Sequence, residues 1–509
     1  HRMVDPIYDS GIDPPEDVDV LAGIADVPGN YANGQYVADP EDRRRGPFED
    51  AAAPHTFLAS AFHRSSDFCG TCHDVSNPVF ERVGGSDYAP GPLDEPPNDF
   101  DSSVLLPLER TYSEWKNSEF ATTGVYAPEF AGNKPDGIVS TCQDCHMADA
   151  QGRGCNVPGT PLRDDLPRHD LTGGNAWVPS IVEQAYPGEV DAQALADGAQ
   201  RAISMLERAA LLDVAVDPEP NGYLATVTIT NRSGHKLPTG YPEGRRMWVS
   251  LAAYDAADQI IYESGAYDPG TGILVEDDDL ALYEAKMGIS PALAGALGLP
   301  AGASFHFTLN DSIYSDTRIP PLGFTNAGFE SFGGQPVDPE APGIRYADGQ
   351  NWDAPQYHLP TETDRVIATL YYQTTSKEYV DFLRDENTTD DRGTVLHDLW
   401  SSNGRSSPVV MVADTADVGV TAIPPALPFE EELSVSALQN PFRDRLVLRL
   451  RVPTPSEVIY RITDVSGRLV CERAQACSAG PIQIVWDGTD GAGRAVSSGL
   501  YWVNIRAGD

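Results

Sequence analysis

The sequence predicts a multidomain chain in which a mostly α-helical and loop-rich first domain, residues 1–210, precedes a β-sandwich domain, residues 211–422, and a smaller C-terminal β-sandwich, residues 430–509. Proline and glycine recur throughout 84–100 and 154–180, which is typical of long loops. After the first domain, segments with alternating apolar and polar residues predict half-buried strands. The last part of the chain has short strands at regular spacing between turn residues, as small sandwiches do.

Length and composition limit the class of protein. At 509 residues the chain exceeds one ordinary core, and 41% hydrophobic residues with a mean hydropathy of -0.32 indicate a soluble protein. No apolar run approaches the roughly 20 residues of a membrane helix. The first residues, from His1 to Pro6, do not resemble a signal peptide, so we expect a mature chain or a fragment.

The charge balance is strongly acidic. The chain has 35 Lys and Arg against 76 Asp and Glu, a formal net charge of -41. Nucleic acid and anionic membranes carry the same sign of charge, so neither is an expected partner. The excess acid indicates a solvated surface or a docking surface for a basic partner.

Two Cys-x-x-Cys-His motifs carry the clearest chemistry in the chain. They comprise Cys69, Cys72 and His73, and Cys142, Cys145 and His146. This spacing lets two thiols bind one porphyrin edge while the histidine becomes an axial ligand of the iron, as in c-type haem attachment. A four-thiolate zinc site is the rival interpretation, but it does not explain the histidine after each pair.

Several histidines are candidates for the opposite face of each iron, since Met147 abuts His146 and cannot reach that face. His55 and His63 flank a stretch with helical spacing, which predicts a helix that presents both rings on one face. His169 precedes a glycine pair that permits close approach of the backbone to a flat ligand. His235 is predicted to lie in a loop between two strands.

Residues 1 to about 255 resemble the multihaem c-type cytochromes that are related in haem arrangement to the tetrahaem and octahaem nitrogen-cycle cytochromes. The resemblance rests on four stretches: F-C-G-T-C-H-D-V-S-N-P around His73, E-W-K-N-S-E-F-A from Glu114, R-H-D-L-T-G-G-N around His169, and G-H-K-L-P-T-G around His235. It implies that His169 and His235 are distal iron ligands and that the domain transfers electrons.

The first residue bears on the number of haems. His1 and the R-M-V-D-P that follows look like the residues just after a Cys-x-x-C pair of this family. The resemblance therefore predicts a third haem, with His1 as ligand and its attachment motif upstream. The alternative is a terminal histidine without this role.

The remaining elements follow in chain order. An apolar stripe predicts a helix over about 191–210 that closes the first domain. Period-two patterns predict the β-sandwich strands 211–216, 223–230, 247–254, 259–263, 365–374 and 408–413, with a helical or irregular insertion near 278–299. Asp311, Asp316 and Arg318 suit a solvated loop better than a metal site or a salt-bridge network.

A proline-rich linker, 423–428, precedes the C-terminal domain, whose strands are predicted at 433–437, 446–452, 458–463, 482–486 and 500–505. This pattern, with N-P-F at 440–442 and W-D-G at 486–488, is similar to the Ig-like C-terminal sorting domain of type IX secretion and to the flagellar hook-cap Ig-like module. Cys471 and Cys477 flank one predicted hairpin and suggest a disulfide. Cys155 is expected to be a buried free thiol.

We expect an extracellular or cell-surface electron carrier with at least two haems, not an enzyme, that acts through bis-His iron. Its expected partners are redox proteins or extracellular electron acceptors, and copies of the chain could polymerise into a filament. Two other functions stay open. One is a multihaem oxidoreductase for a small nitrogen or sulfur compound, and the other is a haem-bearing adhesion or structural protein.

Overall fold

The computed structural model describes residues 1–418, apart from 52, 85–86, 93, 98 and 339–342, and in the rest of the chain mainly strands between 434 and 507. The chain divides into two compact units, His1–Gly419 and Val420–Asp509. The predicted linker 423–428 and the N-P-F turn lie outside the described residues, as does Asp487 of the W-D-G turn. No helix within the described part is long and apolar enough to cross a membrane.

The first 209 residues are not mostly helical, so the fold class predicted for this domain is wrong. Only α7 exceeds eight residues in this part of the structure. The helices are α1 (Glu16–Ala22), η1 (Ala61–Arg64), α2 (Ser66–Gly70), α3 (Thr111–Lys116), α4 (Glu119–Thr122), α5 (Cys142–His146), α6 (Val178–Ala185) and α7 (Ala192–Ala209). Frequent Pro and Gly keep the other segments from extending a helix.

Short strands join the helices of this region into small sheets. Strands β5, β6 and β7 form the largest of them, and β3 pairs with β4 in parallel. The strands are β1 (Met3–Val4), β2 (Val37–Ala38), β3 (Arg44–Gly46), β4 (Phe57–Ala59), β5 (Val75–Gly84), β6 (Asp87–Pro90), β7 (Leu105–Glu109), β8 (Val125–Tyr126), β9 (Ile138–Val139), β10 (Asp149–Gly152) and β11 (Arg163–Pro167).

The predicted helix over 55–63 is also wrong. Strand β4 (Phe57–Ala59) and the single 3-10 turn η1 (Ala61–Arg64) occupy this stretch. Pairing of β4 with β3 extends the backbone, so the rings of His55 and His63 do not share a helix face. His55 is exposed and its Nδ1 contacts the carbonyl of Thr56 at 3.1 Å, and no ring contact among the described residues joins it to another histidine.

The predicted helix at 191–210 is confirmed as α7, and two sheets form the predicted β-sandwich after it. The first sheet has the order β12-β13-β22, with β23 also on β13. The second has β15-β14-β24-β25, with β18 also on β14. Their strands are β12 (Ala210–Glu219), β13 (Gly222–Asn231), β14 (Arg246–Tyr254), β15 (Ile260–Ser264), β18 (Leu282–Tyr283), β22 (Trp352–Asp353), β23 (Gln356–Leu359), β24 (Arg365–Gln373) and β25 (Val409–Asp417).

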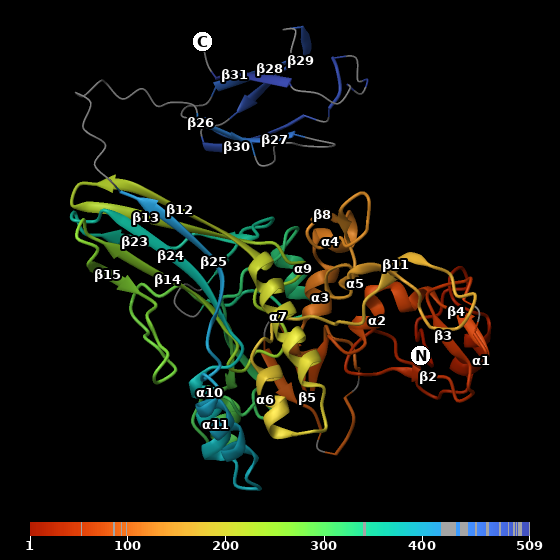
Figure 1. Cartoon of the computed structure of the whole chain (residues 1–509). Coiled ribbons are helices and arrows are strands. Elements are labelled where there is room, and N and C mark those ends of the chain that lie inside the picture. Colours follow the sequence, from red (N-terminus) through yellow and green to blue (C-terminus); the bar gives the residue numbers. More distant parts are fainter. Residues whose placement is uncertain are drawn as a thin grey trace. The chain divides into compact units, whose positions relative to one another are not determined.

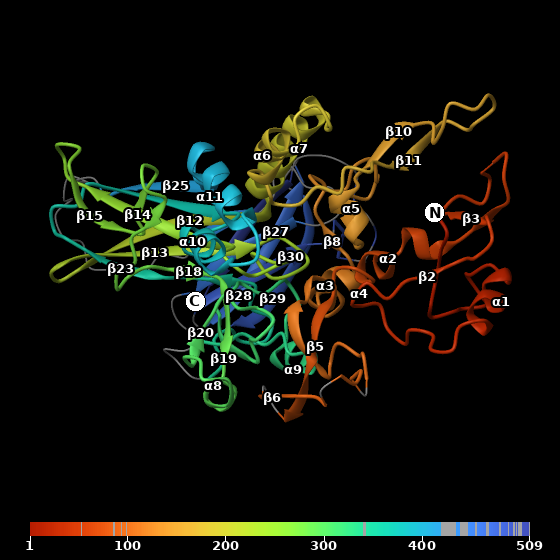
Figure 2. The ribbon, with the colours of Figure 1, turned by 90° about the horizontal axis from the view of Figure 1, so that it is seen from below.

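One core fills the sandwich. Alternate residues of β13 and β14 point inward, so Val227 and Ile229 share a buried cluster with Val249 and Leu251. The insertions add small sheets and helices: β16 (Tyr267–Asp268), β17 (Ile273–Leu274), β19 (Ala285–Ile289), β20 (Gly302–Ala303), β21 (Ser312–Asp316), α8 (Pro291–Leu297), α9 (Asn326–Ser331), α10 (Lys377–Glu386) and α11 (Arg392–Ser402). Figures 1 and 2 both place α3, α4 and α5 between the N-terminal strands and the sandwich.

The C-terminal unit contains two three-stranded sheets, β26-β27-β30 and β29-β28-β31. Their strands are β26 (Ser434–Ala437), β27 (Leu446–Val452), β28 (Ser456–Asp464), β29 (Leu469–Cys477), β30 (Gly480–Trp486) and β31 (Tyr501–Ala507). The predicted disulfide is wrong, because Cys471 is a buried free thiol and Cys477 lies six residues further along the same strand. That separation of about 20 Å exceeds the reach of a disulfide.

Two further predictions are corrected. Cys155 is exposed, and its sulfur lies 3.2 Å from the hydroxyl of Thr160. Asp311 and Asp316 are buried, so they do not lie in a solvated loop. Asp311 binds Ser290 at the start of α8, and Asp316 pairs with Arg318 at 2.6 Å. The salt-bridge alternative therefore describes Asp316 and Arg318 correctly.

Candidate haem-binding site

Each Cys-x-x-Cys-His motif forms one helical turn. In the second motif the Thr141 hydroxyl accepts the Asp144 N–H, and the Asp144 carboxylate accepts the Thr141 N–H at 2.9 Å, so a capping box begins α5. In the first, the His73 N–H donates to the Cys69 carbonyl at 2.9 Å. A helical turn brings positions i, i+3 and i+4 to one face, which suits two thioether bonds and one axial ligand. All four motif cysteines are free thiols.

The two motifs lie side by side. The thiols of Cys69 and Cys142 are hydrogen-bonded to each other, and the Cys142 N–H donates to the Ser66 hydroxyl at 3.0 Å. Gly70 lies under the ring of Tyr112, where an added Cβ would be 2.7 Å from ring carbons. A side chain at residue 70 would therefore displace α3 from the first motif. The contacts of Cys142 with Cys69 and Ser66 hold the two motifs next to each other, and the contact of Gly70 with Tyr112 holds the first motif against α3.

The rings of His146 and His235 lie near each other, at a separation that suits one iron between them. Their ring centroids are 6.3 Å apart and their planes differ by 21°. A metal–nitrogen bond of about 2 Å and about 1.2 Å from nitrogen to ring centre, taken on both sides, give roughly this separation. The Nδ1 of His146 contacts the Thr172 carbonyl and that of His235 contacts the Lys236 carbonyl at 2.9 Å. Metal-ligating histidines use the second ring nitrogen in this way, which leaves Nε2 for the metal.

Both rings have the protonation state that a ligand needs. Burial lowers the pKa of His146 to about 4, with smaller contributions from the nearby rings of His235 and His73. Burial also lowers the pKa of His235. Each imidazole is therefore neutral near pH 7, the form that binds a metal.

His73 has a different environment. It is exposed, and its Nδ1 lies 3.1 Å from the carboxylate of Glu109, a contact that raises the pKa of His73. A carboxylate on Nδ1 is a common second partner of a ligating histidine. Among the ring contacts of the described residues, none joins His73 to another histidine. The structure does not bring a predicted distal ligand to this position.

A second group of histidines gathers around Phe68, next to the first motif. The centroid of His1 lies 6.3 Å from that of His169 and 5.7 Å from that of His63, and the His63 ring lies 5.1 Å from Phe68. Strand β3 fixes His1, because the Arg45 N–H donates to the His1 carbonyl at 2.7 Å. The Nε2 of His63 is buried and has no hydrogen-bond partner among the described residues. Burial lowers the pKa of His63 to about 4.

Two features of these residues therefore fit c-type haem. The thiols and the following histidine of each motif are on one helical turn, and two imidazole pairs have the separation that one iron requires. In the described part of the chain, no group of three or more His, Cys, Asp or Glu side chains is arranged to hold a bare metal ion. Sequence reasoning did not assign a role to Glu109 or to Thr172, because both contact their histidines only through the fold.

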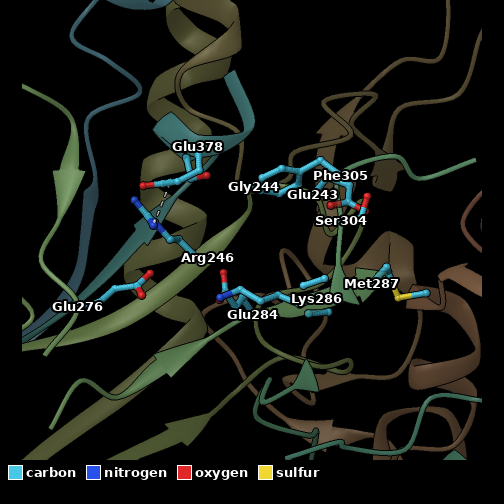
Figure 3. Close-up of a pocket in the computed structure, with 13 residues that line it drawn as sticks. Glu243, Gly244, Arg246, Glu276, Glu284, Lys286, Met287, Ser304, Phe305 and Glu378 are labelled. Atoms are coloured by element: carbon cyan, nitrogen blue, oxygen red, sulfur yellow. Dashed lines mark hydrogen bonds and ion pairs between the residues drawn. The ribbon is translucent and has the colours of Figure 1, made fainter. Parts of the chain in front are cut away.

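A cleft of about 270 Å³ lies in the sandwich domain, away from the motifs (Figure 3). Charged side chains line it, with Lys286 paired to Glu284 at 2.6 Å and Arg246 paired to Glu378 at 3.4 Å. Glu243, only 5% exposed, has no hydrogen bond among the described residues. Burial, with repulsion from Glu284 as the smaller cause, raises the pKa of Glu243 from its ordinary 4.5 to about 8.

This shift predicts a pH-dependent effect of Glu243→Gln. With a raised pKa, the contribution of Glu243 to stability is fully present below pH 4.5 and is lost as the pH rises through about 8. The uncharged variant should be more stable than wild type at pH 9, by about 5 kcal/mol, and equal to it near pH 4.5. Urea unfolding followed by circular dichroism at both pH values measures this. The exposed Glu276→Gln is the control, and an equal effect at both pH values would contradict the prediction.

Comparison with known proteins finds similarity to solved structures. No family model matches the chain, and no curated protein matches it. A penta-haem cytochrome c552 from Thermochromatium tepidum is similar in structure at 17% identity and a TM-score of 0.40, over 76% of this chain and 71% of that one. Dimeric latent PorU from Porphyromonas gingivalis matches at 11% identity and a TM-score of 0.14, over 59% of this chain and 33% of that one.

Proposed function

We propose that the chain is an electron-transfer protein that binds c-type haem at residues 69–73 and 142–146. The observation that carries this proposal is the His146–His235 pair, whose centroid separation of 6.3 Å and whose Nδ1 contacts suit two axial ligands of one iron. When bound, haem supplies one-electron chemistry. At the second motif, Cys142 and Cys145 would hold the haem by thioethers, and His146 with His235 would leave no position on that iron for a substrate. This arrangement favours a carrier over an enzyme.

The proposal extends to a third iron between His1 and His169. Their separation is also 6.3 Å, and a buried, unpartnered Nε2 of His63 lies beside them. A haem there would lie beyond the first motif, since Phe68 adjoins both His1 and Cys69. The contact between Cys69 and Cys142 supports electron movement between the two motif haems.

The wider proposal is extracellular electron transfer. The resemblance of the C-terminal domain to secretion sorting modules supports a location outside the cell or at its surface. The charge of -41 supports docking of a basic redox protein, and extracellular acceptors are the other partner class. We also propose that copies of the chain can polymerise so that haems continue from one copy to the next.

The mass of the purified chain tests the proposal. Native and denaturing mass spectrometry should show two haems that resist extraction with acidic acetone, because thioethers hold them. A further haem present only in the native mass would belong to the His1–His169 pair if His169→Ala removes it. A chain from which all haem is extracted would exclude c-type attachment. A native haem count that is the same for wild type and His169→Ala would exclude the third iron.

One observation favours the oxidoreductase alternative. His73 is exposed, and no histidine ring faces it among the described residues, so its iron could keep one open face. An open face would bind carbon monoxide in the reduced state. Uptake at one iron would favour substrate chemistry at the first motif, whereas no uptake would favour the carrier.

A further inference from the structure

A buried group of charged side chains connects α3 to the loop that carries His235. Its members are Glu114 on α3, Lys236 on the loop, and Asp316 and Arg318 at the end of β21. Glu114 and Lys236 are both 0% exposed. We call these four residues the Glu114 network. Their two cations and two carboxylates balance, as a buried group of charges requires.

Glu114 holds the His235 loop directly. One oxygen of its carboxylate, Oε2, accepts the backbone N–H of Lys236 at 3.1 Å and the hydroxyl of Thr239 at 2.7 Å. The other, Oε1, lies 3.4 Å from Arg318. The Glu114 carboxylate therefore binds the loop at Lys236 and again at Thr239. His235 immediately precedes Lys236 in the sequence.

The cations of the network are fixed by Asp316. The ammonium of Lys236 donates to Asp316 at 2.6 Å, and the guanidinium of Arg318 donates to both carboxylate oxygens at 2.8 and 2.6 Å. Loss of the Glu114 charge would leave a net positive charge one residue from His235. A buried unbalanced charge acts strongly because the surroundings screen it weakly.

Helix α3 also supports the first motif. The Tyr112 N–H donates to the His73 carbonyl at 2.9 Å, and the Tyr112 ring covers Gly70. Two residues further on, Glu114 holds the loop of the second iron's ligand. Gly234 packs against Trp115 and Phe120, so the loop approaches the helix closely. The short helix α3 thus contacts both the first motif and the loop that carries His235.

We propose that Glu114 is the positioning residue for His235 and that its charge lowers the redox potential of the iron between His146 and His235. The inference rests on the proposed haem function. A carboxylate near an iron favours the oxidised state, which has the larger positive charge. Hydrogen bonds from Glu114 to Lys236 and Thr239 keep the loop at the distance that His235 needs.

Two substitutions separate the position from the charge. Glu114→Gln keeps an acceptor for the Lys236 N–H but removes the charge, so the iron at His146 should stay low-spin while its midpoint potential rises. Glu114→Ala removes the acceptor as well, so one iron should become high-spin with the covalent haem count unchanged. Electron paramagnetic resonance and spectroelectrochemical titration measure the two effects. Glu207→Gln, an exposed carboxylate on α7, is the matched control.

The outcomes distinguish the inference from the function on which it rests. Wild-type chain without covalent haem would overturn the proposed function. Low-spin wild type with unchanged potentials in Glu114→Gln would overturn the role of the charge, and a fully low-spin Glu114→Ala would overturn the positioning role. If Glu114→Ala does not fold, Glu114→Asp replaces it: its shorter side chain keeps the charge but not the reach, so a high-spin fraction supports positioning and its absence contradicts it.

Discussion

His235→Ala should convert one iron to a high-spin or water-bound state while the number of covalent haems stays unchanged. The thioethers come from Cys142 and Cys145, which the substitution does not touch, whereas the ring opposite His146 is removed. The low-spin signal of the iron at His146 should therefore disappear. Electron paramagnetic resonance of the oxidised protein gives the spin state, and denaturing mass spectrometry gives the haem count.

The same variant should loosen the sandwich domain. The loop that carries His235 connects β13 to β14, so an iron–histidine bond joins the sandwich to the second motif. Limited proteolysis should therefore cut His235→Ala faster than wild type. His358→Ala is the matched control, because His358 is exposed on β23 and contacts Glu219 at 2.8 Å. A fully low-spin His235→Ala would mean that another residue fills the second axial position.

Replacing both Cys69 and Cys72 with alanine should remove one covalent haem and leave the other. Each motif binds its own porphyrin, so the Soret absorbance should fall by about half. The lost haem should also weaken the region around Phe68, because the first motif contacts the second through Cys69 and Cys142. Haem stain after denaturing electrophoresis and the intact mass measure the count.

Cys155→Ser is the control for this double substitution. Its thiol is exposed and lies outside both motifs, so the haem count should not change. Loss of both haems from the Cys69 and Cys72 variant would show that the second motif requires the first for its attachment. Retention of both would show that residues 69–73 do not bind haem covalently.

The strands of the sandwich were predictable because each is long enough to show its period. Strand β13 alternates buried and partly exposed residues from Ala225 to Asn231, β14 does so from Val249 to Tyr254, and helix α7 has a continuous apolar stripe. The strands of the first domain have two to five residues, apart from β5. Too few positions are present for a period to appear, so this region was predicted as helix and loop.

The candidate site shows the same limit. The two motifs are local in sequence, so their six candidate ligand and attachment residues could be predicted from spacing alone. His235 was identified by resemblance, and its distance to His146 became visible only in the fold. Asp316 and Arg318 were assigned to a solvated loop because charged residues usually lie at the surface. Their burial depends on Lys236 and Glu114, which are distant in sequence.

His235 lies later in the chain than the second motif, and this order has a consequence for how the protein is made. A chain delivered from its N-terminus presents residues 142–146 before the strands β13 and β14 that flank the His235 loop. Haem attached at that stage has one unoccupied coordination position until the sandwich forms. His235 would then complete the coordination sphere only after the sandwich has folded. The visible spectrum of the haem would report whether this downstream domain has formed.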